Sequence, residues 1–186
     1  MTIEAVLLTG GASSRMGADK AQLEVDGVPL ARRIAGQISA LGIPVTVLGN
    51  QPLPEHKFLA DAAQYEGPLI ALSRFTPERE LIFVVSCDLV RFDARLVGLL
   101  SGGIGQSEAA IPVVAARLQP LCALYRREPW AKLAETVACG KRSIMAWIER
   151  LDVRELNEGE FMDLDPRCVL GANTPGEYAQ ALREQY

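Results

Sequence analysis

Four short apolar runs recur along this chain, separated by segments with helical or turn-like patterns. The runs are residues 5–8 (AVLL), 45–48 (VTVL), 81–85 (LIFVV) and 109–114 (AAIPVV). Runs that are apolar on both faces are typical of strands in a sheet covered by helices on both sides, and such sheets are largely parallel. We therefore predict an α/β sandwich whose functional site lies at the carboxyl ends of the strands.

Amphipathic patterns between these runs predict the helices. Leu30, Ile34, Ile38 and Leu41 recur at near-helical spacing after Pro29, which suits the first turn of a helix. The two tryptophans fall on further apolar stripes and are therefore expected to pack in the core. Further helices are expected from Asp93 to Gly102-Gly103, from Pro129 to Gly140, from Ser143 to Leu151 and from a capping box at Thr174 to about Arg183.

Composition and charge exclude several classes of protein. A chain of 186 residues with 49% hydrophobic residues suits one domain, residues 1–186, with a full core. The formal net charge of −4 provides no general attraction for nucleic acid or an anionic membrane surface. The apolar runs are too short to span a bilayer, and the N-terminus lacks the basic start of a signal peptide. We expect a soluble cytoplasmic protein.

Cysteine and histidine chemistry has little support in this sequence. The 4 cysteines are widely separated and form no C-x-x-C pair, so reduced and mostly buried thiols are expected. The single histidine, His56, lies in a polar stretch and is interpreted as a solvated loop residue. Catalysis in this chain would therefore depend on carboxylates, Lys, Arg and backbone N–H groups.

The segment directly after the first apolar run is rich in glycine and carries positive charge. Residues 8–20 read LTGGASSRMGADK. The adjacent Gly10 and Gly11 let the backbone turn sharply and point N–H groups at phosphate oxygens. Arg15 can bind two phosphate oxygens at once, and Lys20 adds a mobile charge. Because the spacing fits neither a Walker A loop nor G-x-G-x-x-G, we predict a different triphosphate-binding loop, the alternative being a turn with solvated charges.

Two acidic residues follow apolar runs at places where strands would reach the edge of a sheet. Asp88 comes directly after residues 81–87, and Asp61 follows residues 58–60. A polyphosphate must be neutralised before it is attacked, and Mg²⁺ held by one or two carboxylates is the usual means. From the residues alone, Asp88 is either a Mg²⁺ ligand or a capping residue, and Asp61 is more readily a solvated turn residue.

The string at residues 8–20 resembles the L-x-G-G-x-S-x-R-M-G-x-D-K signature of molybdenum cofactor guanylyltransferases, within the wider group of sugar-nucleotide-type nucleotidyltransferases. The resemblance continues in the family's order over almost the entire chain. Its further segments are D-x5-G-P-L at 61–69, Cys-Asp at 87–88, QPLCALY at 119–125, GKRSI at 140–144 and NTP at 173–175.

This resemblance implies a three-layer α/β sandwich with a mostly parallel twisted sheet, of the nucleotide-diphospho-sugar transferase (Rossmann-like) type. It implies transfer of GMP from GTP to the phosphate of molybdopterin or the molybdenum cofactor, with Mg²⁺ and release of pyrophosphate. It also implies transient contact with cofactor-delivery and acceptor proteins. No nucleic-acid or membrane partner is expected, and the chain is expected to be a monomer or weak oligomer.

Residue by residue, the resemblance places three roles on this chain. The expected nucleotide-binding residues are Leu8, Thr9, Gly10, Gly11, Lys20, Asp61 and Asp88. The expected catalytic residues are Lys20, Arg15 and Asp88, and Asp88 is also the expected metal ligand. The expected acceptor-binding residues are Lys141, Arg142 and Asn173, although a solvated basic turn is equally plausible for Lys141 and Arg142.

Four positions depart from the family pattern. Thr9 replaces Ala, Ala71 replaces Gly, Val90 replaces Pro and Gly171 replaces Asn. The changes at Val90 and Gly171 leave open a non-catalytic nucleotide sensor on the same scaffold. The other alternative is cytidylyl transfer from CTP, but cytidylyl relatives resemble L-A-A-G at the turn, so Gly10-Gly11 favours GTP.

Overall fold

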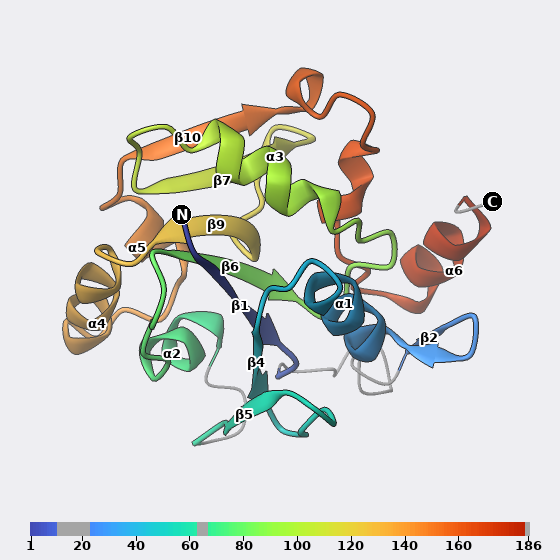
Figure 1. The fold of residues 1–186 in the computed structure, drawn as a ribbon, viewed down its shortest axis with the longest axis horizontal. Helices are drawn as coiled ribbons and strands as arrows, with labels where there is room; N and C mark the ends of the chain where they lie inside the picture. Colours follow the sequence, from blue (N-terminus) through green and yellow to red (C-terminus); the bar gives the residue numbers. More distant parts are fainter. Residues whose placement is uncertain (11–22, 63–66, 185–186) are drawn as a thin grey trace.

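The computed structural model describes residues 1–10, 23–62 and 67–184. Its strands are β1 (Ile3–Leu8), β2 (Glu24–Val25), β3 (Val28–Pro29), β4 (Val45–Gly49), β5 (Lys57–Ala60), β6 (Leu81–Ser86), β7 (Ala109–Val114), β8 (Arg117–Leu118), β9 (Cys122–Arg126) and β10 (Val153–Asn157). Among the described residues, eight strands form one sheet in the order β10-β7-β9-β6-β1-β4-β5, with β8 beside β7 (Figure 1). The four apolar runs became β1, β4, β6 and β7, as predicted.

The sheet is mostly parallel, which confirms the predicted fold class. β1 pairs in parallel with β4 and β6, β4 with β5, and β7 with β10. β9 is antiparallel to both β6 and β7, so these two strands point in the same direction. The carboxyl ends of β5, β4, β1, β6 and β7 therefore meet at one edge of the sheet. The register places Leu8 level with Leu48 on one side and with Ser86 on the other.

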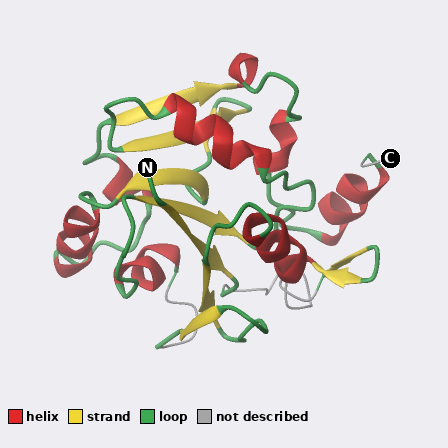
Figure 2. Cartoon of the chain, in the orientation of Figure 1, coloured by secondary structure: helices red, strands yellow, loops and turns green. Residues whose placement is uncertain are grey.

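Helices cover both faces of this sheet, and Figure 2 shows them around the yellow strands. The helices are α1 (Leu30–Ser39), α2 (Pro68–Ser73), α3 (Arg95–Gly103), α4 (Trp130–Ala138), α5 (Met145–Ile148) and α6 (Pro175–Arg183), with short 3₁₀ helices at Glu158–Glu160 and Pro166–Val169. α1 and α3 pack on one face, and α2, α4 and α5 pack on the other. The result is a three-layer sandwich.

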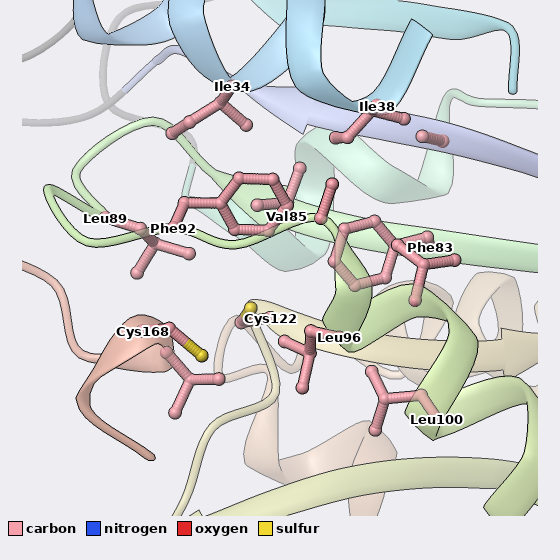
Figure 3. Close-up of a cluster of buried hydrophobic side chains, with 14 of the residues drawn as sticks. Ile34, Ile38, Phe83, Val85, Leu89, Phe92, Leu96, Leu100, Cys122 and Cys168 are labelled. Carbon is pink, nitrogen blue, oxygen red and sulfur yellow. The ribbon is translucent and has the colours of Figure 1, made fainter. Parts of the chain in front are cut away.

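Each face of the sheet contributes to a separate apolar core because side chains alternate along the strands. Figure 3 shows the first core, where Phe83 and Phe92 stack with ring centroids 6.1 Å apart. In the second core Trp147 stacks on Tyr125 at 4.8 Å and meets the edge of Trp130 at 5.5 Å. Both tryptophans are buried, as predicted.

The helix predictions hold with three corrections at helix ends. The helix expected to be capped by Asp93 is α3, which begins at Arg95 with Ala94 at the N-cap. The first helix was expected to carry Leu41 and to have Pro29 in its first turn, but it spans Leu30–Ser39, with Pro29 at the N-cap. Gly42 adopts a positive φ of 73° and closes a turn directly after the helix, which leaves Leu41 52% exposed. The helix expected from Ser143 to Leu151 is a single turn, α5.

Several elements were not predicted from the sequence. They are the strands β8, β9 and β10, the hairpin of β2 and β3, the helix α2 and the two 3₁₀ helices. The hairpin turn is Asp26-Gly27, whose φ values of 54° and 75° are those of a type I′ turn. An Asp-Gly pair is a known signal for such a turn, so the hairpin could have been found. The cysteine expectation is confirmed among the described residues, because all are free and only Cys139 is exposed.

Candidate active site

The exit of β1 lies at the middle of the sheet's carboxyl edge and is held by both neighbouring strands. The Thr9 N–H donates to the Leu48 carbonyl at 2.8 Å, and the Thr9 hydroxyl reaches the same oxygen at 3.2 Å. On the other side, the Cys87 N–H donates to the Leu8 carbonyl at 3.0 Å. The Leu8 side chain is buried in the second core. Leu8 can therefore offer only its backbone to a ligand.

Asp61 is brought to this exit from the end of β5. Its N–H donates to the Gly49 carbonyl at 2.9 Å, which extends the pairing of β4 and β5. A Cβ atom at Gly10 would lie 2.4 Å from Asp61 Oδ2, so the carboxylate rests against the Gly10 backbone. The other oxygen accepts from Arg74 Nη2 at 3.4 Å, and the Asp61 side chain is 11% exposed. The structure therefore brings Gly10 and Asp61 together.

Gly49 is a site residue that the sequence did not indicate. A Cβ atom there would lie 2.2 Å from Thr9 Oγ1 and 2.7 Å from the Gly10 nitrogen, and its φ is 155°. No side chain fits this space without displacing the backbone of the β1 exit. Gly49 thus allows the ends of β1 and β4 to approach closely at the point where Gly10 begins the turn.

Asp88 lies in the turn after β6, on the other side of β1 from Asp61. The Ser86 hydroxyl donates to Asp88 Oδ1 at 2.7 Å, and the Ala172 N–H donates to the Asp88 carbonyl at 3.0 Å. A Cβ atom at Gly171 would lie 2.7 to 2.8 Å from all three atoms of the carboxyl group. The segment before α6 therefore lies directly against Asp88.

This contact also brings the exposed Asn173 to the same region as Asp88. Asn173 Nδ2 donates to the Gly171 carbonyl at 3.4 Å, and its backbone N–H donates to Glu177 Oε2 at 2.6 Å. Glu177 is the acidic member of the capping box that begins α6, which confirms the predicted helix start. An expected nucleotide residue and an expected acceptor residue are thus neighbours in space.

Asp88 suits a metal ion whose remaining ligands come from the substrate phosphates and from water. Among the described residues there is no group of three or more His, Cys, Asp or Glu side chains that could hold a metal ion. Mg²⁺ commonly binds one or two carboxylates together with substrate phosphates and water, so a single carboxylate at this edge fits that ion. Burial raises the pKa of the nearby Cys122 thiol well above its ordinary value, with nearby Cys168 and Asp88 charges adding to the effect. A buried thiol with a raised pKa is a poor nucleophile, so Cys122 is assigned to packing.

Two of the departures from the family pattern are absorbed by packing. Val90 is buried in the first core beside Leu89 and Phe92, and Ala71 is buried in the second core. Both are small apolar residues in apolar surroundings. The changed loop after Asp88 therefore keeps its contact with the core.

The described part of the structure does not test the roles of five expected residues. Gly11, Arg15 and Lys20 lie outside the described residues, and their roles stay predictions. Lys141 and Arg142 lie in the exposed loop between α4 and α5, where the Lys141 N–H donates to the Thr136 carbonyl at 3.2 Å. Their place at the acceptor also stays a prediction. None of the helices in the described ranges combines the length and the apolar composition that a membrane span requires.

Known proteins resemble this chain over most of its length. The model of the MobA-like NTP transferase domain matches residues 5–155. A probable molybdenum cofactor guanylyltransferase of Nostoc sp. is 30% identical, with 95% of this chain and 89% of the relative covered. A molybdenum cofactor guanylyltransferase of Desulfosudis oleivorans is 24% identical, with 90% and 87% covered.

Solved structures share the fold over almost the whole chain. Molybdopterin-guanine dinucleotide biosynthesis protein A from Archaeoglobus fulgidus superposes with a TM-score of 0.82 at 19% identity, covering 97% of both chains. Rv0371c from Mycobacterium tuberculosis, solved in complex with manganese, superposes with a TM-score of 0.65 at 17% identity, covering 98% of this chain and 99% of the other. From the family model and the near-full-length relatives together, this chain belongs to the MobA-like NTP transferase family.

Proposed function

We propose that this chain is a molybdenum cofactor guanylyltransferase, which transfers GMP from GTP to the phosphate of molybdopterin and releases pyrophosphate. The observation that carries the proposal is the carboxyl edge of the sheet, where Asp61 and Asp88 lie on opposite sides of the β1 exit. Relatives with this function share 24% to 30% identity over nearly the whole chain, which supports the same reaction.

The nucleotide would bind at the β1 exit. The backbone from Thr9 onward, with Gly10 and Gly11, would face the phosphates, and Asp61 would fix the nucleoside part. Asp88 would hold Mg²⁺, and a bound Mg²⁺ would neutralise phosphate charge. The manganese in the mycobacterial neighbour is consistent with a divalent cation in this fold. Magnesium is proposed because its preferred ligands are carboxylate, phosphate and water.

The reaction needs positioning and charge stabilisation rather than a covalent intermediate. An oxygen of the acceptor phosphate attacks the α-phosphorus of GTP and forms a new P–O bond. The bond from the α-phosphorus to the bridging oxygen breaks, and its electron pair leaves with pyrophosphate. Arg15 and Lys20 would stabilise the charge that develops on the phosphates. Lys141, Arg142 and Asn173 would bind the acceptor.

Two alternatives were left open by the sequence. A non-catalytic sensor loses its main support, because Val90 packs in the core and Gly171 accommodates the Asp88 carboxylate. The other alternative was CTP as the nucleotide donor, and Gly10-Gly11 still favours GTP over CTP. The proposed substrates are cytoplasmic metabolites, so we propose that the protein acts in the cytoplasm, with only transient contact with cofactor-delivery and acceptor proteins.

The test is product formation by the purified chain. We expect GTP, Mg²⁺ and molybdopterin to yield pyrophosphate and a product heavier than the acceptor by one GMP residue, measured by mass spectrometry. CTP in place of GTP should yield little product, and D88N should lose on the order of a hundredfold in rate. An inactive wild-type chain, or preference for CTP, would contradict the proposal.

A further inference from the structure

A cavity of about 720 Å³ opens beside Asp88 at the carboxyl edge of the sheet. Gly171 forms part of its wall and also lies directly against the Asp88 carboxylate. The rest of the wall comes from the β7–β8 hairpin with Gln119, from Arg91 after β6, from the 3₁₀ helix at Pro166–Val169 and the segment that follows it, and from α6 with Glu184. Residues far apart in the sequence therefore face one space. Gly171 and Ala172 of the wall contact Asp88, the proposed metal ligand, and the cavity is large enough for a small organic ligand.

The positive charges around this cavity are not equivalent. Arg91 and Arg167 both pair with Glu184 near the end of α6, and Arg167 also pairs with Asp165. These two guanidinium groups are therefore neutralised within the protein. Arg117 is different, because no acidic partner for its side chain is present among the residues that the structure describes.

The backbone of Arg117 is nevertheless firmly placed. Arg117 pairs with Val114 across the β7–β8 ladder, and the Gln119 side-chain amide donates to its carbonyl at 3.2 Å. The tight turn before it uses Ala115 and Ala116 at φ values of 51° and 57°. The Ala115 N–H is held by Glu158 Oε1 at 2.8 Å. A supported turn thus holds an uncompensated guanidinium at the wall of the cavity.

Because Asn173, an expected acceptor-binding residue, lines this cavity, the acceptor would lie in it, and we propose that Arg117 binds the acceptor's phosphate monoester. The inference rests on the proposed function, and it assigns the acceptor phosphate to a residue different from Lys141 and Arg142. A guanidinium binds a phosphate through two parallel N–H bonds, which suits a dianionic monoester. The remaining lining offers apolar surface at Leu118 and Leu170 and an amide at Gln119, which suits a flat polar heterocycle.

The test measures binding separately from turnover. Calorimetric titration of the full-length protein with molybdopterin, without nucleotide and under anaerobic conditions, should show that R117Q weakens binding about 10- to 100-fold. R117K should retain part of the affinity, since it keeps the charge but not the planar fork. Added salt should weaken binding to the wild-type protein more than binding to R117Q. Titration with GTP and Mg²⁺ should be unchanged in both variants.

R79Q is the matched control, since Arg79 is an exposed arginine at the opposite end of β6. It should bind molybdopterin as the wild-type protein does. Equal molybdopterin affinity of R117Q and wild type would overturn the inference, as would loss of GTP affinity in R117Q or no molybdopterin binding by the wild type. A wild-type chain that binds molybdopterin through Arg117 but makes no product would contradict the proposed function and still support this inference.

Discussion

Gly10 and Gly171 each face a carboxylate across a space that cannot hold a Cβ atom. A Cβ at Gly10 would lie 2.4 Å from Asp61 Oδ2, and one at Gly171 would lie 2.7 to 2.8 Å from the Asp88 carboxyl atoms. Asp61 and Asp88, which are expected to bind the nucleotide, therefore each lie against the backbone of a glycine. In this structure a Cβ of the family's Asn at position 171 would occupy the space that the Asp88 carboxylate takes.

G171A should therefore impair the site without unfolding the protein. The new methyl group would force the Asp88 carboxylate to rotate, which breaks its bond from the Ser86 hydroxyl. We expect kcat/KM to fall about 10- to 100-fold, the size of effect that a misplacement of about 1 Å produces. The required Mg²⁺ concentration should rise in a metal titration of the initial rate.

The control for this substitution is G98A, because a Cβ at Gly98 meets nothing within 4 Å. Gly98 lies in α3, where alanine is favoured over glycine, so its rate should be unchanged and its stability slightly increased. A G171A enzyme with a normal rate and a normal metal titration would show that Asp88 does not depend on this contact.

Arg74 should act on the nucleotide through Asp61. It lies at the end of α2 and holds one oxygen of Asp61 at 3.4 Å, while the other oxygen rests on Gly10. We expect R74A to raise the KM for GTP about tenfold and to leave kcat within about twofold, because a lost charge-assisted hydrogen bond costs on the order of 1.5 kcal/mol. Steady-state kinetics with R127A, an exposed arginine, as control would test this. A fall in kcat at constant KM would contradict it.

At the scale of elements, a charged contact joins β7, α4 and the start of β10. Glu108 binds Lys132 of α4 at 2.6 Å and accepts from the Asp152 N–H at 2.9 Å. The bond from Lys132, followed by that from Asp152, lowers the pKa of Glu108 below its ordinary value of 4.5. A lowered pKa stabilises the fold above pH 4.5, and this contribution is lost as the pH falls through the folded-state pKa.

E108Q should therefore lower the free energy of unfolding by about 0.5 to 1 kcal/mol at neutral pH, a modest value because both side chains are partly exposed. The difference from wild type should shrink as the pH falls below 4.5. Urea unfolding between pH 3 and pH 7 measures it, with E149Q, an exposed glutamate, as control. A difference that stayed constant over this range would exclude Glu108 as its source.

Elements with a strong local pattern could be predicted, and those that depend on distant pairing could not. The covered strands β1, β4, β6 and β7 carry uninterrupted apolar runs, and α6 begins with a capping box. Residues 119–125 were noted only as a family motif and not as a strand. The strand β9 forms there because it pairs with β6 and β7, whose residues are far away in the sequence. The site follows the same division. Asp61 and Asp88 could be located because they follow strands, whereas Gly49, Arg74 and Gly171 matter through contacts made only in the fold.

At the scale of the whole molecule, one sheet separates two apolar cores. Alternate residues of the same strand serve different cores, for example Leu7 in the first and Leu8 in the second. If the strands separated, the apolar side chains of both cores would be exposed, because the same strands contribute to both. We therefore propose that residues 1–186 form a single cooperative domain, as the length of the chain predicts.

The tryptophans make this proposal testable, because both lie in the second core and their fluorescence reports on that face alone. F83L shortens a fully buried side chain in the first core and should lower the free energy of unfolding by roughly 1 to 2 kcal/mol. In a cooperative domain, fluorescence and circular dichroism must show the same shift of the urea midpoint. F58L, at a 37% exposed position in β5, should change the free energy of unfolding by no more than about 0.5 kcal/mol in either signal. If F83L moved the circular dichroism transition and left the tryptophan transition in place, the two faces would unfold independently.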